Sequence, residues 1–551
     1  MKSVSSPTKI IVSVVAVVLL VIIGIVSLGF LPVSISSPAE VKKNPEGVAF
    51  ISKQSPLVVS LLGNPEKGLG SLLAILANNK GQEKIKSALN ELRNNFLRQT
   101  GVESLGEIKS WLGDEVTFAV TSLDWDNNED NGIEAGYLLV VKNKSPQLAR
   151  EFLQNYYSQE AVSEETELAV EDYLGVKIVY KYPTSPHSPT KPVAAAVVAD
   201  FVVFANHLSV LKEALNNLQA VELSLAQDSD YQKSIASLPA KKIGIVYGNL
   251  PSTLAWINKK AKVTDANIHQ NLTLSLVANA KGIISHIALS GLSPSVNKSP
   301  HFTSLPATLS YIPEDSIALV SGGNLKQLWQ DIQDSKHPSA GILKQAIYLL
   351  ESGIGVNCRQ EIFPYINGEY SISLRENRET QSLDWLLVKE KGDILLTSHL
   401  DEIARKQQWN ISQLPFHDKS ITVWTKVTTA SGNKNASLTT QVKGIHLETE
   451  AYEIITNTVN YLEEIFPQPK ESIVDSTAFR ENISWLPKEN NGYLYLQWQR
   501  ISPYITSRFP LIGIIELTFK PLFDNLQSIT ITSEGIKDGI FYSSVFLRFS
   551  P

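Results

Sequence analysis

Sulfur-containing residues are almost absent from this chain of 551 residues, which has one cysteine, Cys358, and one methionine, the initiator. A single cysteine excludes an intramolecular disulfide framework and a thiolate metal cluster. The lack of internal methionine excludes a methionine-lined copper site or binding surface. Charge is nearly balanced too, with a formal net charge of −6 at pH 7. This balance argues against a nucleic-acid-binding surface, so we exclude nucleic acid as a partner.

Familiar catalytic and metal-binding motifs are lacking as well. The nine histidines form no H-x-x-x-H or H-x-H pair, so a zinc or copper site would have to be assembled from distant residues. No G-x-S-x-G, S-x-x-K, Walker loop or G-x-G-x-x-G stands in a fitting context. We therefore predict no catalytic residues and no cofactor, and we favour a non-enzymatic protein over an enzyme.

One acidic loop has part of a calcium-binding pattern. Asp126, Asn128 and Asp130 alternate as at the start of an EF-hand loop. However, Asn131 stands where the loop's glycine should be, and Tyr137 stands where its bidentate glutamate should be. The three alternating residues are the weak candidates for a metal site, and a solvated hairpin loop is the reading we favour.

The longest apolar run is Ile10–Leu31, which contains no charged side chain. At about 1.5 Å per residue it spans roughly 33 Å, enough to cross a hydrocarbon core of about 30 Å. Lys2 and Lys9 precede the run, and the positive-inside tendency then leaves a short cytoplasmic N-terminus and exports the rest. We predict a transmembrane anchor and a single-pass membrane protein. A cleaved signal peptide is the alternative.

One stretch of the chain occurs twice. Residues 224–249 and 472–497 align without a gap at an offset of 248 residues, and the aligned positions share a Leu-Pro step, a glycine and a tyrosine. Each copy is typical of a short helix that ends at Leu-Pro and is followed by a half-buried strand beginning at glycine. Other segments recur in the same order. We therefore predict an internal duplication, and two unrelated α+β domains are the alternative.

Apolar alternation and turn residues predict the remaining elements. The expected strands of the first half are 57–62, the end of 108–120, 137–141, 176–182, 193–199, 201–205, 272–277 and 283–289. Its expected helices are 69–96, the segment from Ser145-Pro146 through Tyr157, and a helix capped by Ser209 that runs to Asn217. In the second half, we expect strands at 318–321, 385–388, 529–533 and 540–548, with 451–462 in place of the Ser209 helix.

Neither half has a regular β-α-β rhythm, which favours the α+β class with largely antiparallel sheets. We expect a single N-terminal transmembrane helix followed by two similar modules, each a mainly antiparallel sheet with packed helices. The predicted boundaries are a short cytoplasmic segment at 1–9, the anchor at 10–31, a linker at 32–47, a first module at 48–291, a linker at 292–307 and a second module at 308–551.

Two motifs in the first half resemble those of a known family. Trp-Leu-Gly-Asp-Glu at residues 111–115, and Ala-Val-Val-Ala-Asp-Phe-Val-Val-Phe-Ala at residues 196–205, resemble the signature of the bacterial DUF3352 family. The resemblance is weaker in the second half, where Gly444 stands in the place of Asp200. The family is functionally uncharacterised and implies no site residues. Its longer members look cyanobacterial, which implies a plasma or thylakoid membrane.

These features predict a membrane-anchored extracytoplasmic protein that is periplasmic or thylakoid-lumenal and binds protein partners of the membrane or envelope. It would act as a scaffold or assembly factor, and the resemblance implies partners related to photosystems or thylakoids. Ile10–Leu31 would supply the membrane contact, while the sequence names no binding residues. The alternative is an envelope hydrolase, or a ligand- or lipid-binding protein, with a site between the two modules.

Overall fold

The computed structural model describes residues 44–63, 110–160, 166–183, 193–263, 270–279, 281–291, 302–334, 357–377, 382–392, 395–431, 436–508, 516 and 520–549. The described residues divide into two compact units, one with residues 44–291, 536–542 and 549, and the other with residues 302–535 and 543–548. We follow chain order and call the described residues before and after position 293 the first and second modules. The expected anchor Ile10–Leu31 and the expected helices of 69–96 lie outside the described residues. Among the residues that are described, no helix is both long enough and apolar enough to cross a bilayer.

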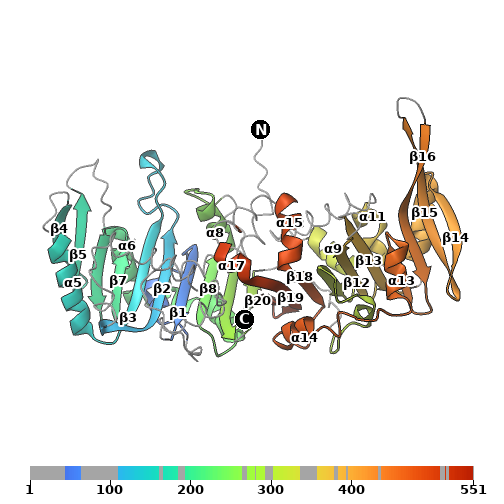
Figure 1. The fold of residues 1–551 in the computed structure, drawn as a ribbon. Coiled ribbons are helices and arrows are strands. Elements are labelled where there is room, and N and C mark those ends of the chain that lie inside the picture. Colours follow the sequence, from blue (N-terminus) through green and yellow to red (C-terminus); the bar gives the residue numbers. More distant parts are fainter. Residues whose placement is uncertain are drawn as a thin grey trace. The chain divides into compact units, whose positions relative to one another are not determined.

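The first module is an antiparallel sheet with helices packed against it (Figure 1). Its strands are β1 (Leu57–Leu62), β2 (Leu112–Ser122), β3 (Gly136–Asn143), β4 (Thr166–Tyr173), β5 (Val176–Pro183), β6 (Val193–Val198), β7 (Phe201–Ala205), β8 (Gly244–Asn249), β9 (Asn271–Asn279) and β10 (Gly282–Ser290). Its helices are α5 (Pro146–Glu160), α6 (Leu208–Gln219), α7 (Ser229–Ser237) and α8 (Leu250–Ile257), with 3-10 turns η1 (Gly47–Phe50), η2 (Glu129–Asn131), η3 (Val221–Leu223) and η4 (Leu225–Gln227). The strand order is β10-β9-β8-β1-β2-β3-β7-β6-β5-β4.

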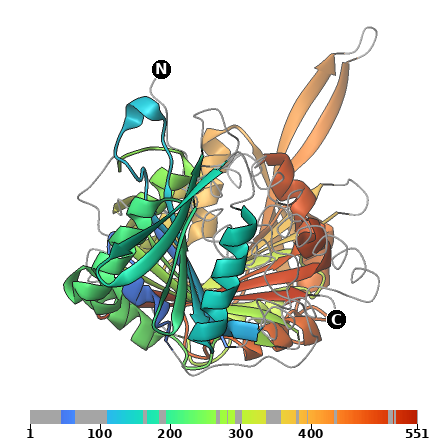
Figure 2. The ribbon, with the colours of Figure 1, turned by 90° about the vertical axis from the view of Figure 1, so that its left-hand side faces the viewer.

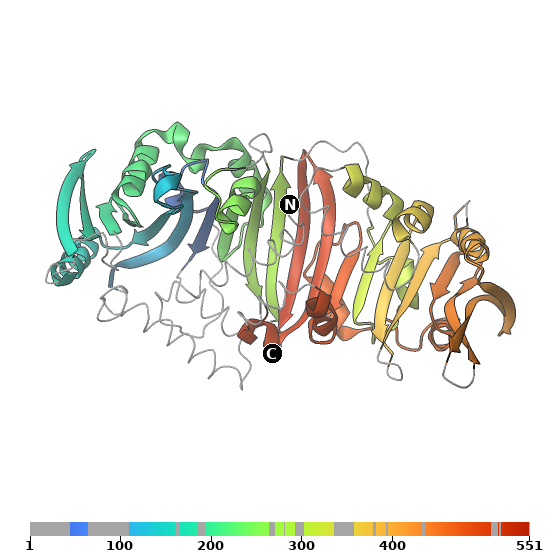
Figure 3. The same ribbon diagram turned by 90° about the horizontal axis from the view of Figure 1, so that it is seen from above.

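The second module has the same kind of sheet (Figure 3). Its strands are β11 (Ala318–Gly322), β12 (Tyr370–Glu376), β13 (Leu383–Glu390), β14 (Asn410–Phe416), β15 (Lys419–Ser431), β16 (Ala436–Glu448), β17 (Tyr452–Thr456), β18 (Tyr493–Gln497), β19 (Leu526–Lys537) and β20 (Ile540–Phe549). Its helices are α9 (Leu325–Asp334), α11 (Cys358–Glu361), α12 (Leu396–Lys406), α13 (Val459–Ile465), α14 (Thr477–Ser484), α15 (Trp498–Arg508) and α17 (Lys520–Asn525), with η5 (Ala307–Tyr311) and η6 (Phe363–Tyr365). The order is β20-β19-β18-β11-β12-β13-β17-β16-β15-β14, antiparallel from β19 to β14.

Helices cover both faces of the second module's sheet. Leu386 and Val388 of β13 belong to a core that also holds Leu462 of α13 and Phe479 of α14. Leu387, between them, belongs to a separate core that α9, α11 and α12 complete. Successive side chains of a strand point to opposite faces, so a strand buried on both faces needs a continuous apolar run. That requirement explains the apolar centre of β13.

The expected class is confirmed at the coarse level, because the chain is a mixed α/β protein dominated by antiparallel sheet with helices. The repeated stretch also folds as expected in both places. In the first module, α7 and β8 bring the rings of Tyr231 and Tyr247 together at 5.1 Å and 86°. In the second, α14 and β18 bring those of Phe479 and Tyr495 together at 5.4 Å and 84°. Each strand expected in the first half is present.

Two expectations about helices are wrong. Ser209 does not cap α6, which begins at Leu208 and is capped by His207, whose Nδ1 accepts from Ser209 N at 3.3 Å. The segment 451–462 is not one helix, because its first part is strand β17, and α13 begins only at Val459. The β-branched pair Ile454-Ile455 is buried on β17, and pairing with β13 decides for a strand there.

The expected match of Gly444 to Asp200 is also wrong. Asp200 lies in the turn between β6 and β7, whereas Gly444 lies inside β16. A Cβ at Gly444 would approach the ring of Trp424 to 2.7 Å, so glycine is required there by close packing. Strands β4, β14, β15 and β16 were not expected from the sequence, and without them the turn after β16 could not be placed.

Candidate functional site

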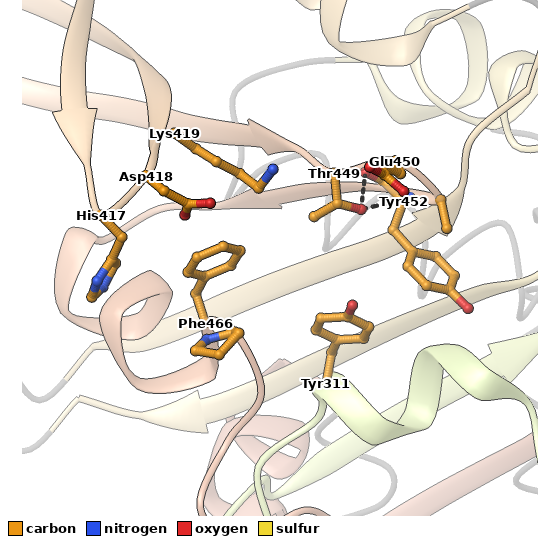
Figure 4. A pocket seen from close by; sticks show the side chains of 10 residues that line it. Tyr311, His417, Asp418, Lys419, Thr449, Glu450, Tyr452 and Phe466 are labelled. Atoms are coloured by element: carbon orange, nitrogen blue, oxygen red, sulfur yellow. Dashed lines mark hydrogen bonds between the residues drawn. The ribbon is translucent and has the colours of Figure 1, made fainter.

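One pocket opens in the second module where the β14–β15 turn, the β16–β17 turn and the chain after α13 meet (Figure 4). Its volume is about 600 Å³, within the range of small-molecule sites. It is lined by Tyr311, His417, Asp418, Lys419, Thr449, Glu450, Ala451, Tyr452, Phe466 and Pro467. We call this site the aromatic pocket, because four of its lining side chains are aromatic rings.

One wall of the aromatic pocket is formed by His417 and Phe466. His417 and Asp418 form the two-residue turn between β14 and β15, with Phe416 paired to Lys419 across it. His417 has a φ of 52°, in the left-handed region that two-residue hairpins require. The rings of His417 and Phe466 lie 5.7 Å apart, and both pack on Phe416, at 4.7 Å and 5.6 Å.

The opposite wall is formed by Tyr311 of η5 and Tyr452 of β17, whose rings lie 5.3 Å apart at 63°. Burial raises the pKa of Tyr311, and burial, followed by the charge of Glu369, raises the pKa of Tyr452. Both hydroxyls therefore stay protonated at neutral pH and are available as hydrogen-bond donors. The hydroxyl of Thr449 bonds to Tyr452 N (2.8 Å) and to Tyr452 O (3.1 Å), which fixes the β16–β17 turn.

Three charged side chains surround the mouth of the pocket. Asp418 and Glu450 are exposed, and Lys419 is partly exposed, with its side chain extending toward Thr449 (Figure 4). Within the part of the chain that the structure describes, none of the three makes an ion pair. Two carboxylates against one ammonium leave the mouth with a net negative charge, if His417 is counted as neutral.

The first module has the same turn without these polar groups. Leu174 and Gly175 form the two-residue turn between β4 and β5, with Tyr173 paired to Val176. Leu174 has the same φ, 52°, as His417. Where the second module has histidine, aspartate and lysine, the first therefore has leucine, glycine and valine.

The tyrosine wall also has an apolar counterpart in the first module. Phe50 is the last residue of η1 and Phe201 begins β7, just as Tyr311 is the last residue of η5 and Tyr452 begins β17. The two phenylalanine rings lie 5.4 Å apart at 67°, almost the geometry of the two tyrosines. The second module thus carries hydroxyls and charges where the first has apolar side chains, on a two-residue turn and a ring pair of similar geometry.

A two-stranded extension is the other unusual feature of the second module. Pairing of β15 with β14 ends at Thr425, and β17 pairs with β16 only from Ile445 onward. Among the described residues, the outer parts of β15 and β16 pair only with each other. We call residues 425–431 and 436–442 the ribbon, which extends beyond the neighbouring strands (Figure 2). Val427 and Val442, 45 % and 41 % exposed, lie diagonally on one face of it.

The expected metal candidates Asp126, Asn128 and Asp130 lie in the loop between β2 and β3, where the side-chain oxygens of the first two accept hydrogen bonds from the loop itself. The carboxylate of Asp126 accepts from Asn131 Nδ2 at 2.6 Å and from Asn128 N at 3.0 Å. These bonds, with that of Asn131 the largest, lower the pKa of Asp126. Asn128 Oδ1 accepts from Asp130 N at 3.3 Å. No group of three metal-ligating side chains is found among the described residues.

Asp114 and Glu115 point to opposite faces of β2, as expected for neighbours on a strand. Asp114 is exposed, whereas Glu115 is buried and accepts from Glu46 N at 2.8 Å and Gly47 N at 2.6 Å. Burial raises the pKa of Glu115. Its role is to hold the start of η1 against the sheet. Cys358 is buried.

Two histidine–carboxylate pairs each have one member on α12, and none of their residues lines the aromatic pocket. His399 contacts Glu361 (2.7 Å) and Tyr365 OH (3.0 Å) through its two ring nitrogens. Asp401 bonds to His446 (3.2 Å) and also accepts from an indole N–H of β15. Both rings are partnered on packed elements, which is the arrangement of structural histidines.

The sequence reasoning missed the aromatic pocket, whose residues come from four separate parts of the chain. One sequence difference could have indicated the pocket: the β14–β15 turn carries polar residues where the first module's turn carries Leu174-Gly175. To use this difference one must first recognise β14 as a strand, and β14 is hard to recognise because it carries polar residues and is mostly exposed. Of the aromatic residues in and just after the second copy of the repeated stretch, Trp485 is 45 % exposed, while Tyr493, Tyr495 and Trp498 are buried.

Comparison with known proteins places the chain in a family without giving it an activity. No curated protein matches it. Among solved structures, crystal form I of TP0453 is similar over 47 % of this chain and 83 % of that one, at 12 % identity and a TM-score of 0.24, too low to carry an argument. The family model described as "Protein of unknown function (DUF3352)" matches residues 12–549. The resemblance seen in the sequence is therefore confirmed, and the chain belongs to the DUF3352 family.

Proposed function

We propose that this protein is a non-enzymatic scaffold or assembly factor that holds a protein partner on the extracytoplasmic side of a membrane. Ile10–Leu31 would anchor it, with the modules in the periplasm or the thylakoid lumen. The observation that carries the proposal is the ribbon. An isolated two-stranded ribbon is at best marginally stable in water. A partner that covers it would bury Val427 and Val442 and would stabilise the strand pairing.

We further infer that the two modules descend from one by internal duplication. The shared strand order supports this, and so do equivalent hydrogen bonds inside each module. In the first, Asn206 Oδ1 accepts from Tyr137 N at 2.8 Å. In the second, Asn457 Oδ1 accepts from Trp385 N at 2.9 Å. In both, the asparagine directly follows one strand and accepts from the first part of the neighbouring strand. Duplication would free one copy to acquire a binding role while the other kept the ancestral surface.

Removal of the ribbon tests the proposed function. Thr425 lies directly opposite Val442, so residues 426–441 can be replaced by Asn-Gly, which closes a two-residue hairpin at that pair. The full chain and the trimmed chain are isolated from membranes in mild detergent, and co-purifying proteins are compared. We expect a partner that is recovered with the full chain, at stoichiometric amounts, and lost with the trimmed chain.

The matched control is the first module's hairpin, in which Leu174 is 45 % exposed at the β4–β5 turn. Leu174→Asn also fits a left-handed turn position and should leave the co-purifying proteins unchanged. The proposal is wrong if only the bait is recovered from both chains, or if the trimmed chain keeps every partner while its thermal unfolding is unchanged.

A further inference from the structure

We infer that the aromatic pocket receives an arginine side chain of a protein partner, with the guanidinium between the two aromatic walls and in contact with Asp418 and Glu450. This goes beyond the ribbon, since it assigns a separate site and a chemical group to it. It rests on the proposed function only in taking the arginine from a protein partner. Both walls and both carboxylates belong to the second module alone.

The two walls offer aromatic rings to a planar cation. Tyr311 and Tyr452 stand on one side, and His417 and Phe466 on the other (Figure 4). A cation over an aromatic face is attracted by the negative charge of the ring's π-system. Arginine is favoured over lysine in this role because its guanidinium is planar, stacks on rings, and is less strongly hydrated than an ammonium.

The charges at the mouth of the pocket also favour a cationic ligand. Asp418 and Glu450 are unsatisfied by any ion pair with the described residues, and each can accept two parallel N–H bonds from a guanidinium. An anionic ligand would meet two carboxylates against the single ammonium of Lys419. We assign Lys419 a different contact, a main-chain carbonyl of the segment that carries the arginine, because its side chain extends along the mouth toward Thr449 (Figure 4).

The first module supplies the comparison. Its equivalent turn has Leu174, Gly175 and Val176, and its equivalent wall has Phe50 and Phe201, so it keeps aromatic faces but has no carboxylate at the turn. A structural requirement of the fold would be met by either set of residues. The fold does not require the polar set of the second module, and a bound cation would use its carboxylates and rings together.

Peptide binding to the full chain in detergent micelles tests the inference. The probe is acetyl-Gly-Arg-Gly-amide, observed by saturation-transfer NMR, and the reference is the same peptide with citrulline, which keeps the shape and loses the charge. We expect arginine binding at a dissociation constant of about 1 mM, since one side chain buries little surface. We expect the citrulline peptide to bind about tenfold or more weakly, because charge-assisted hydrogen bonds are roughly twice as strong as neutral ones.

Two variants separate the site from the fold. Asp418→Asn with Glu450→Gln should weaken the arginine peptide by about tenfold or more, because both charge-assisted bonds become neutral. Tyr311→Phe with Tyr452→Phe copies the first module's wall, keeps both faces, and should change binding by less than about threefold. Thermal unfolding of each variant is measured beside that of the unsubstituted chain, and binding is compared only if the unfolding temperatures agree.

The inference is overturned if the citrulline peptide binds as well as the arginine peptide, or if the Asp418→Asn, Glu450→Gln variant binds arginine normally. Preference for acetyl-Gly-Glu-Gly-amide or for a neutral disaccharide would also overturn it. The ribbon-trimmed chain should bind the arginine peptide normally. If the trimmed chain binds the peptide while the full chain recovers no partner, the proposed function fails and the arginine site stands. If the full chain recovers a partner through the ribbon but neither chain prefers the arginine peptide, only the arginine site is removed.

Discussion

The buried ion pair Lys389–Glu453 allows a quantitative test of how the second module is stabilised. Lys389 is 2 % exposed and Glu453 is 0 % exposed, and they form a close ion pair across β13 and β17. The other carboxylate oxygen of Glu453 accepts from Thr397 N at 2.8 Å and from the Thr397 hydroxyl at 2.7 Å. At the equivalent pair of the first module stand Val141 and Val202, both buried.

The comparison of the two modules suggests replacing both charged residues by valine. The loss of free energy of unfolding should then differ from the loss when Lys389 alone is replaced. Lys389→Val alone leaves the Glu453 carboxylate buried without its counter-charge, which should lower the free energy of unfolding by about 3–5 kcal/mol. Lys389→Val with Glu453→Val removes both charges and restores an apolar pair. Thr397 N then loses its acceptor, at a cost of about 1–3 kcal/mol, whereas the Thr397 hydroxyl keeps a second acceptor, Glu448 Oε1, at 2.8 Å. The double variant should therefore be more stable than the single one.

The measurement is hydrogen exchange, followed by mass spectrometry, of the peptides that cover β13 and β17. A local measurement is needed because a chain of two modules need not unfold in one step. Lys391→Val is the control, since the Lys391–Glu448 pair is about one-third exposed on each side and its loss should cost less than about 1 kcal/mol. A double variant less stable than Lys389→Val, or a Lys389→Val loss no larger than the control's, would refute the reasoning.

Two further predictions concern the equivalent glycines Gly244 and Gly492 and the buried carboxylate of Glu115. Gly492 has a φ of 125° and an added Cβ would lie 2.0 Å from Ser321 O, whereas at Gly244 it would lie 3.1 Å from Ser60 O. Gly492→Ala should therefore lower the free energy of unfolding by more than about 3 kcal/mol, and Gly244→Ala by about 1 kcal/mol, in denaturant titrations; equal losses would contradict this. Because burial raises the pKa of Glu115 above 4.5, the folded protein keeps a proton that the unfolded chain releases, so stability should fall as pH rises from about 4.5. Glu115→Gln should remove this part of the pH dependence of Tm, and an unchanged slope would contradict it.

Local sequence patterns predicted the elements whose neighbours agree with them. The run 57–62 is β1 at the same bounds, and the strands expected for the two closing hairpins lie within β9, β10, β19 and β20. Local patterns did not predict β14, β15 and β16. The exposed positions of these strands carry polar and charged residues, and each strand is held by pairing with its neighbour. Local patterns also failed at 451–462, where pairing of β17 with β13 overrides a helical pattern.

The functional residues could be found only after the sheet was known. Tyr311, His417 and Tyr452 are up to 141 residues apart in the chain, and none lies in a recognisable motif. The antiparallel pairing of β14 with β15 and of β16 with β17 brings their turns to one end of the sheet. A turn such as His417-Asp418 is ordinary by itself, and it becomes informative only beside the tyrosines and beside its apolar counterpart in the first module.

By itself, the sequence determined the family, the antiparallel α+β class and the two copies of a helix–strand stretch, because apolar period, glycine turns and Leu-Pro steps act over a few residues at a time. The tertiary structure decided which residues face one another: the aromatic pocket, the ribbon and the buried Lys389–Glu453 pair all depend on contacts across strands. The physical reason is that strand pairing is a long-range interaction, whose partner is selected by burial of both faces and by register rather than by neighbours in the chain.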